Sequence, residues 1–226
     1  DPMTKKRGLM KYVTTDEIPD IFVGIIESLK VGEVSEPIKS SNGFHILKLN
    51  DIQEFEIEGI SIGDSLLNYL SKEEIIKDIE FNKPAYKNYS NDFGEVYIFD
   101  NFESYDRLSF KVKPDDKKYI IYHIKGSISY DNKLDQCFAK KEEIKQEFSK
   151  IFKNAKQQSK TLKFKFDSTG KSVTYSDYFY LDSGDFARVG CAKYRKDLKI
   201  KNNWEDSLQV TIGTEEILKW FSKPIN

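Results

Sequence analysis

The sequence predicts an α+β fold, in which a small helix-and-hairpin segment is followed by a mainly antiparallel sheet packed with one long helix. Apolar residues recur every three or four positions between Ile18 and Leu29, which is the spacing of an amphipathic helix. The same spacing returns over a longer stretch from Leu134 to Ala155. Other segments of the chain alternate apolar and polar residues, as strands with one buried face do.

The first 52 residues predict one helix and an antiparallel hairpin. The helix begins near Glu17 and is followed by a turn and a short strand through Val34. A Ser-Asn-Gly turn at 41–43 then leads to a second strand, Phe44 to Leu49. Both faces of this second strand are apolar, so we expect a central strand that is mostly buried on both sides. A further strand is predicted at Gly8 to Val13.

The rest of the chain predicts two short helices, six strands and two further helices. Asp64 is a candidate cap for the first short helix, and Ser71 with Glu74 forms a capping box for the second. The long helix is expected to run from Leu134 to Lys156. The expected strands are Glu95 to Phe99, Asp106 to Lys113, Lys118 to Tyr130, Ser172 to Leu181, Asp185 to Tyr194 and Ser207 to Gly213, and the last helix is Thr214 to Phe221.

Three motifs near the N-terminus resemble the C-terminal half of a parvulin-type peptidyl-prolyl cis/trans isomerase domain. They are IPDIF at the helix start, LKVGEVSEPIKS across the turn and first strand, and GFHILKLND in the second strand. Within this family, periplasmic chaperones of the SurA type are the most similar. We therefore expect two domains, a truncated parvulin half-domain at 1–53 and an α+β domain of unknown function at 54–226.

The resemblance implies catalytic roles for His45 and Asp1. In parvulins the matching histidine sits in the central strand, pairs with a histidine of the first strand and belongs to a polar network under the proline pocket. Asp1 matches a position at which the family carries Cys or Asp, and this residue is thought to polarise or desolvate the twisting amide. The alternative for His45 is a core histidine that is satisfied by hydrogen bonds.

Four other residues match positions that bind the substrate in the family. Phe22 corresponds to an aromatic residue that lines the proline pocket, although a plain core aromatic explains it about equally well. Ser40 and Asn42 fall where the family often carries hydroxyl residues, and Asn42 departs from the commoner choice. Ile18, which with Pro19 replaces a Met-Gln pair of many active members, would belong to the substrate wall.

A complete parvulin domain begins with a strand that carries a first histidine, followed by three helices, and the chain begins after that point. We therefore expect a fragment or processed product of an exported isomerase or chaperone that binds unfolded or Pro-containing polypeptide. Without the partner histidine we expect little or no isomerase activity, so the assignment as an enzyme stays open. The missing strand would also leave Gly8 to Val13 poorly paired, or paired elsewhere. A noncatalytic secreted binding or structural protein is the alternative.

Charge and composition argue against several other partners. The 36 Lys and Arg residues nearly balance the 37 Asp and Glu residues, so no strong basic field attracts nucleic acid. No apolar run reaches the roughly 18 residues of a membrane-spanning helix. The two histidines and two cysteines lack metal-binding spacing, and nucleotide-binding motifs are missing, so we expect neither a metal nor a cofactor. The sequence leaves the client proteins and the oligomeric state open.

Cys137 and Cys191 are predicted to form a disulfide bond. Cys137 lies on the apolar face of the long helix, and Cys191 shares a strand face with Ala187 and Val189, so both thiols should reach one helix-on-sheet interface. Two buried free cysteines are the alternative, because cysteine is often buried when unpaired. A bond would place the protein in an oxidising compartment, in agreement with the periplasmic or secreted location that the resemblance implies.

Overall fold

The computed structural model describes residues 18–30, 32–49, 56–86, 89–100 and 102–223. The chain divides into two compact units, Asp1–Glu54 and Phe55–Asn226, which we call unit 1 and unit 2. The predicted strand Gly8 to Val13, with the expectation about its pairing, lies outside the described residues. Among the helices that are described, none combines the length and the hydrophobicity that crossing a membrane requires.

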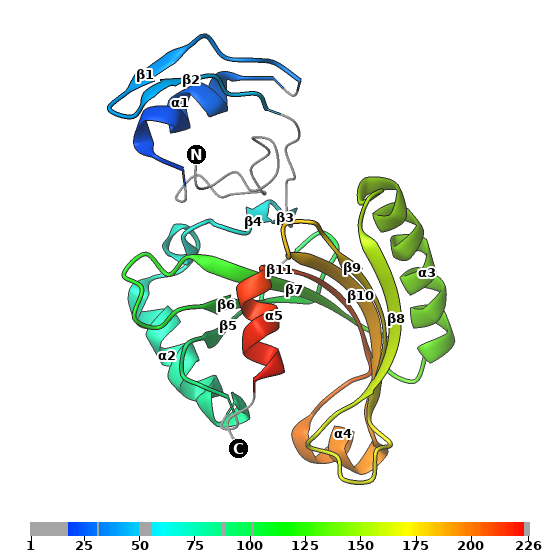
Figure 1. The fold of residues 1–226 in the computed structure, drawn as a ribbon. Helices are drawn as coiled ribbons and strands as arrows, with labels where there is room; N and C mark the ends of the chain where they lie inside the picture. The colour runs from blue at the N-terminus through cyan, green and yellow to red at the C-terminus, as the bar shows by residue number, and fades with distance from the viewer. Residues whose placement is uncertain (1–17, 31, 50–55, 87–88, 101, 224–226) are drawn as a thin grey trace. The chain divides into compact units, whose positions relative to one another are not determined.

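Unit 1 contains one helix and one hairpin in its described part (Figure 1). The helix is α1 (Asp20–Ser28), as its apolar spacing predicted. Strands β1 (Ile38–Ser40) and β2 (Gly43–His45) pair antiparallel around the predicted turn, with Ser40 opposite Gly43. Gly43 has a φ of 120°, a conformation that glycine adopts far more easily than residues with a side chain. The turn therefore depends on this glycine.

The expectation that Phe44 to Leu49 forms a buried central strand is wrong. Strand β2 ends at His45, and the side chains of Phe44 and Ile46 are 74% and 64% exposed. Helix α1 contacts the His45 side of the hairpin through Phe22. Side chains alternate along a strand, so Phe44 lies on the other side, where no described element covers it. The apolar residues on both faces of this segment led to the prediction of burial on both sides. In the structure the segment belongs to a two-stranded hairpin, and helix α1 contacts only one side of it.

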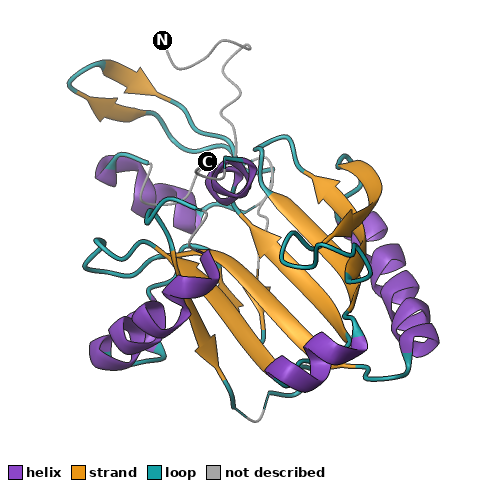
Figure 2. Cartoon of the chain, turned by 90° about the horizontal axis from the view of Figure 1, so that it is seen from below, coloured by secondary structure: helices purple, strands orange, loops and turns teal. Residues whose placement is uncertain are grey.

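Unit 2 is built on one seven-stranded antiparallel sheet, whose strands lie side by side in Figure 2. The strand order is β5-β6-β7-β11-β10-β9-β8. All six predicted strands are confirmed, and β8 is additional. The bounds are β5 (Gly94–Ile98), β6 (Arg107–Val112), β7 (Ile121–Ser129), β8 (Lys156–Lys163), β9 (Val173–Tyr180), β10 (Phe186–Lys193) and β11 (Ser207–Gly213), and a two-stranded sheet of β3 (Glu56–Ile57) and β4 (Ile60–Ser61) precedes them.

The helices of unit 2 begin largely where the sequence predicted them. Ser71 and Glu74 form the expected capping box of α2, with hydrogen bonds in both directions. The cap of the preceding 3-10 helix is Ser65 and not Asp64, because the Ser65 hydroxyl accepts the backbone N–H two residues later. The bounds are η2 (Leu66–Asn68), α2 (Lys72–Asn82), η3 (Lys83–Tyr86), α3 (Leu134–Ile151), α4 (Lys196–Asn202) and α5 (Glu215–Ser222).

Three elements of unit 2, α3, β8 and α4, differ from the prediction. Helix α3 ends at Ile151 and not at Lys156, and the chain returns as strand β8. The sequence of β8, KQQSKTLK, contains a single large apolar residue, so it carries no alternating pattern. An alternating apolar pattern is not needed here, because β8 is an edge strand that is mostly exposed. Its lysines discourage pairing of this edge with other chains. The short helix α4 was not predicted either.

One face of the sheet carries the main hydrophobic core. Helix α3 packs on this face against β10 and β11, and Phe148 of α3 meets Phe179 of β9 edge to face. Cys137 and Cys191 are both fully buried here and form the predicted disulfide bond, with their Cα atoms 6.1 Å apart. The bond joins the long helix to strand β10 across a sequence separation of 54 residues.

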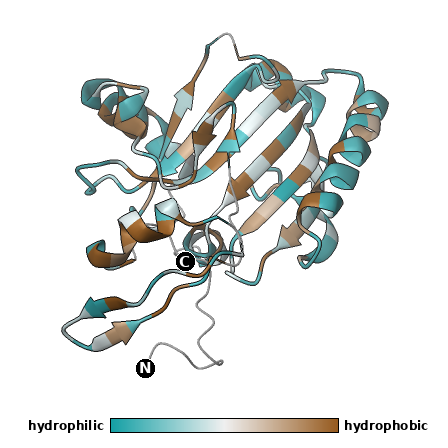
Figure 3. Ribbon diagram, turned by 90° about the horizontal axis from the view of Figure 1, so that it is seen from above, coloured by the Kyte–Doolittle hydropathy of each residue, from teal (hydrophilic) through white to brown (hydrophobic). Residues whose placement is uncertain are grey.

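The opposite face of the sheet is largely polar, and teal and brown bands alternate along the strands in Figure 3. Helix α5 packs on part of this face, beside β7, where Trp220 and Phe93 belong to a second, aromatic cluster. Further along the face, Glu95 Oε1 lies 2.7 Å from Lys111 Nζ and 3.6 Å from Lys125 Nζ. This face, which we call the polar face, therefore buries charged groups together with aromatic rings.

The charges around Glu95 depend on one another. Burial alone would raise the pKa of Glu95, but the charges of Lys111 and Lys125 and a hydrogen bond from Tyr86 hold that pKa well below its usual range. Burial lowers the pKa of Lys111 to about 8, and the nearby Lys125 acts in the same direction against the attraction of Glu95. The single carboxylate of Glu95 thus partly compensates the positive charges of two ammonium groups, those of Lys111 and Lys125.

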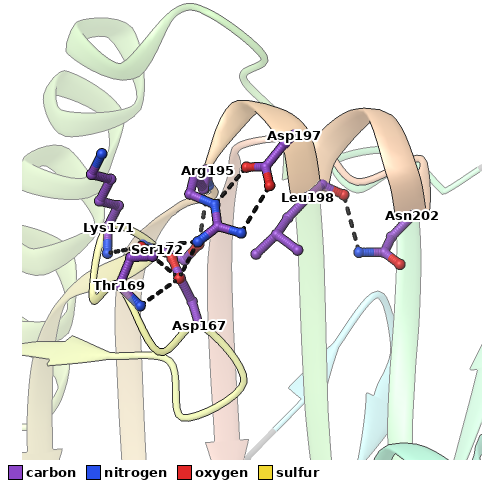
Figure 4. Close-up of polar contacts among 8 residues, drawn as sticks. All are labelled: Asp167, Thr169, Lys171, Ser172, Arg195, Asp197, Leu198 and Asn202. Carbon is purple, nitrogen blue, oxygen red and sulfur yellow. Dashed lines mark hydrogen bonds and ion pairs between the residues drawn. The ribbon is translucent and has the colours of Figure 1, made fainter.

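Arg195 ties the loop between β8 and β9 to helix α4 (Figure 4). Its guanidinium donates to Asp167 at 2.8 Å and to Asp197 at 2.8 Å. The Asp167 carboxylate also accepts from the hydroxyl and N–H of Thr169 and from the N–H of Ser172, and these bonds hold its pKa well below its usual range. Because every member of this cluster has a partner, we assign it a structural role.

His123 makes the stability of unit 2 depend on pH. Its ring is 5% exposed and contacts Phe221 of α5, and burial together with Lys111 and Lys125 lowers its pKa well below the ordinary value. The unfolded chain binds a proton at His123 below about pH 6.5, whereas in the folded chain the lowered pKa moves this protonation to a lower pH. The free energy of unfolding should therefore fall as the pH drops from 6.5 to 5, by up to about 1.4 kcal/mol per pH unit.

Urea unfolding of the whole chain between pH 5 and pH 8 measures this effect. In His123→Phe, which removes the titrating ring, the slope between pH 5 and pH 6.5 should decrease. Glu95 contributes to acid sensitivity only below about pH 4.5, so it does not interfere in this window. Between pH 7 and pH 8 the variant and the parent should have the same slope. An undiminished slope in the variant at pH 5 to 6.5 would show that His123 is not its source.

Candidate functional site

The hairpin of unit 1 joins His45 to Ser40 by a hydrogen bond. Ser40 ends β1 and His45 ends β2, and the antiparallel register places both side chains on the same side of the ribbon. The distance between Ser40 Oγ and His45 Nε2 is 2.7 Å. The Ser40 oxygen also accepts the backbone N–H of Asn42 at 3.1 Å, which fixes the turn below the pair. The tight turn thus holds both side chains of the pair.

Helix α1 adds an aromatic side chain to this pair. The rings of Phe22 and His45 have centroids 5.1 Å apart and planes inclined by 65°, an edge-to-face arrangement. Phe22 reaches the hairpin because it lies on the apolar side of α1. Ile18, which precedes the helix, is buried at 8% exposure. The structure therefore brings Phe22, Ser40 and His45 into one cluster, which we call the histidine cluster.

The remaining predicted site residues are placed differently. Asn42 enters the turn through its backbone, and its side chain is exposed. Asp1 lies outside the described residues. No hydrogen bond or ring contact of Ile18 with the histidine cluster is present among the described contacts. Of the six residues that the resemblance assigned, three therefore meet in the structure.

The chemistry of prolyl isomerisation does not require a strong acid or base. Rotation about an X-Pro bond must overcome a barrier of ~20 kcal/mol that arises from amide resonance. A protein lowers that barrier by binding the twisted amide better than the planar one. An aromatic edge beside a hydroxyl–imidazole pair offers an apolar wall and a polar anchor for such a ligand.

The apolar side of the hairpin is a feature that the sequence reading missed. Phe44 and Ile46, two residues apart, are both exposed, as are Val34 and Ile21 elsewhere in unit 1. Val34 forms an isolated antiparallel bridge with Lys48, and its neighbours Glu33 and Ser35 form backbone hydrogen bonds with Leu49 and Leu47. A contiguous exposed apolar surface often marks an interaction site. The apolar residues on both faces of this segment were visible in the sequence. Their exposure was not, because it depends on whether another element packs on this side of the hairpin, and no described element does.

Residues 1–51 match the family model of the rotamase described as a PPIC-type PPIase domain. The match ends before the described part of unit 2 begins. The histidine cluster, which lies between residues 22 and 45, falls inside the matched segment. The N-terminal segment is therefore similar to parvulin-type isomerase domains, as its motifs predicted.

Curated proteins similar to this chain include several chaperones named SurA. The chain is 35% identical over 69 residues to the chaperone SurA of Shewanella denitrificans, covering 29% of this chain and 16% of that protein. It is 32% identical over 114 residues to the chaperone SurA of Salmonella typhimurium, covering 42% and 27%. The chain thus spans about a quarter or less of the length of these relatives. No solved structure shows a significant match to it.

Proposed function

We propose that unit 1, whose residues 1–51 match the PPIC-type PPIase family, binds unfolded or Pro-containing polypeptide without catalysing prolyl isomerisation. The observation that carries the proposal is the histidine cluster of Phe22, Ser40 and His45 on one side of a hairpin. The other side exposes Phe44 and Ile46. Apolar side chains of this kind can bury against an extended client, and the similarity to proteins named chaperone supports that role.

The histidine content of the chain supports the proposed lack of catalysis. The resemblance pairs the His45 position with a second histidine, and this chain contains two histidines in all. The other one, His123, is buried in unit 2 against Phe186 and Phe221. This supports the proposal that His45 has no histidine partner in the given chain and that the chain by itself does not catalyse isomerisation.

A prolyl isomerase assay on a Pro-containing tetrapeptide tests the inactive state. The 226-residue chain should give a rate within about twofold of the uncatalysed reaction, because stabilising the twisted amide requires both halves of the family's site. A complete parvulin-type isomerase in the same assay serves as the positive control. An acceleration of orders of magnitude that His45→Ala abolishes would refute the proposal.

Binding of a permanently unfolded, fluorescently labelled polypeptide tests the peptide-binding role. Phe44→Ser should weaken the affinity about tenfold or more, since it removes most of one exposed Phe side chain from the interface. The matched control is Phe81→Ser in helix α2 of unit 2, because Phe81 is 80% exposed and lies outside unit 1. The two substitutions should not change folding measurably. Equal loss in both variants, or no binding by the parent chain, would contradict the proposal.

We also propose that the protein works in an oxidising compartment, such as the periplasm or the extracellular space. The buried disulfide bond of unit 2 supports this, because structural disulfides persist where thiols are not kept reduced. Mass spectrometry of protein isolated with a thiol-alkylating reagent tests it. A chain that is found mainly with both cysteines alkylated would argue against this location.

A further inference from the structure

The polar face of the unit 2 sheet carries a strong excess of positive charge. The pairing register places six basic residues on this one face, against the single carboxylate of Glu95. The chain as a whole has a net charge of −1, so the excess is local and does not reflect composition. The basic residues are Arg107, Lys111, Lys125, Lys156, Lys160 and Arg188.

Arg188, in the middle of strand β10, has no acidic partner among the described residues. Its guanidinium donates to four neutral side chains on the two flanking strands, at distances of 2.9 to 3.4 Å. Burial lowers the pKa of this guanidinium, because these neutral acceptors do not offset the loss of hydration. The acceptors are Thr174, Ser176, Gln209 and Thr211. These neutral acceptors fix the position of the guanidinium, but they carry no negative charge that would compensate its positive charge.

Gly190 provides the space in which the guanidinium lies. A Cβ atom at this position would meet the Ser176 hydroxyl and would come within 3.0 Å of Arg188 Nη2. Glycine weakens the interior of a strand, so its presence here marks a close approach by another group. The nearest group is the Ser176 hydroxyl and the next is Arg188 Nη2, so Gly190 leaves room for the hydrogen bond between Arg188 and Ser176.

Two hydroxyl groups on the polar face are buried and lack a hydrogen-bond partner among the described residues. They belong to Ser109 on β6 and Ser207 on β11, whose residues are 1% and 2% exposed. An unpaired buried hydroxyl is costly and is rare in folded proteins. By the strand register both face the same side of the sheet as Arg188 and Lys125. They are donors without an acceptor.

We propose that the polar face around Arg188 is a binding site for a small ligand that carries an oxyanion, either a carboxylate or a phosphate. The anion accepts from the guanidinium and the neighbouring ammonium groups, and its charge supplies the compensation that the described side chains do not. Tyr178, stacked on Tyr180 and 5.9 Å from the Arg188 guanidinium carbon, provides an adjacent aromatic wall for the rest of the ligand. The site lies in unit 2 and is independent of the function proposed for unit 1.

Thermal unfolding of the whole chain in inorganic phosphate or sodium acetate, at constant ionic strength set by sodium chloride, tests the proposal. The unfolding midpoint should rise with the logarithm of the concentration of at least one of the two anions. Arg188→Gln should weaken the apparent affinity at least about tenfold, because it removes a charge-assisted contact. Lys193→Gln is the matched control: it loses the same charge from the same strand, but Lys193 is exposed on the opposite face. It should bind as the parent does.

Two further variants keep the test decisive if Arg188→Gln does not fold. Lys160→Gln removes an ammonium group that lies 5.1 Å from the centroid of the Tyr178 ring, so without added anion it should unfold as the parent does, yet respond less to the anion. Gly190→Ala crowds the Ser176 hydroxyl and Arg188 Nη2, which disturbs the hydrogen bonds that position the guanidinium, and should also respond less. The proposal is overturned if neither anion raises the parent midpoint above that in chloride alone, or if all three variants respond as the parent does.

Discussion

Removing the Cys137–Cys191 bond is expected to lower the free energy of unfolding of unit 2 by about 4 kcal/mol. The bond closes a loop with a sequence separation of 54 residues, and a loop of this length restricts the unfolded chain strongly on the chain-entropy model. Typical domain stabilities are about 5 to 15 kcal/mol, so the loss is a large share of the total. The double variant Cys137→Ala/Cys191→Ala, compared with the oxidised parent in urea, measures it.

Reduction of the parent protein provides an independent measurement without a substitution. Urea unfolding in the presence of a reductant should bring the midpoint close to that of the double variant. Titration of thiols in the native protein should detect none before reduction and two after unfolding with reductant. Two reactive thiols without reductant, or a reduced protein as stable as the oxidised one, would contradict the expectation.

Replacing Glu95 by Gln is expected to destabilise unit 2 by about 3 to 5 kcal/mol. The residue is 3% exposed and its carboxylate compensates Lys111, which is 1% exposed, and partly Lys125. The amide keeps the shape of the side chain but leaves two ammonium groups on the polar face without a nearby anion. Removing one partner of a buried ion pair costs more than the pair contributes, because the remaining charge has been taken out of water. Urea unfolding at pH 7 measures the change.

A surface ion pair of the same unit provides the matched control. Glu216 lies 3.0 Å from Lys113, and both side chains are at least a third exposed, so Glu216→Gln should cost about 0 to 1 kcal/mol. The double variant Glu95→Gln/Lys111→Met should be less destabilised than the sum of its two single changes, since it removes both charges. Equal effects of Glu95→Gln and Glu216→Gln would mean that the Glu95 site is hydrated.

The sequence by itself determined the fold class, the capping box at Ser71, and six of the seven strands of the large sheet. These depend on local patterns: periodicity of apolar side chains, turn residues and caps, which act between neighbours in the chain. It also predicted the bond between Cys137 and Cys191, because the face of the helix and the parity of the strand follow from position alone. The motifs around His45 predicted the similarity of the N-terminal segment to parvulin-type domains, which the family match to residues 1–51 confirms.

Only the tertiary structure decided which apolar side chains are buried and which charged side chains form ion pairs. Phe44 and Ile46 carry the pattern of a buried strand, yet they are exposed because no described layer packs on their side of the hairpin. The pattern also showed charged residues inside apolar strands, such as Lys111 between Phe110 and Val112, without showing what they face.

Their partners come from other strands, through pairing registers that no local pattern encodes. Glu95 and Lys111 are opposite each other on neighbouring strands, and Arg188 is opposite Thr211 on β11 and Tyr178 on β9. The polar face that results is a property of the assembled sheet. Contacts between residues distant in sequence depend on which strands become neighbours, and this is set by packing of the whole unit and not by the residues beside each strand.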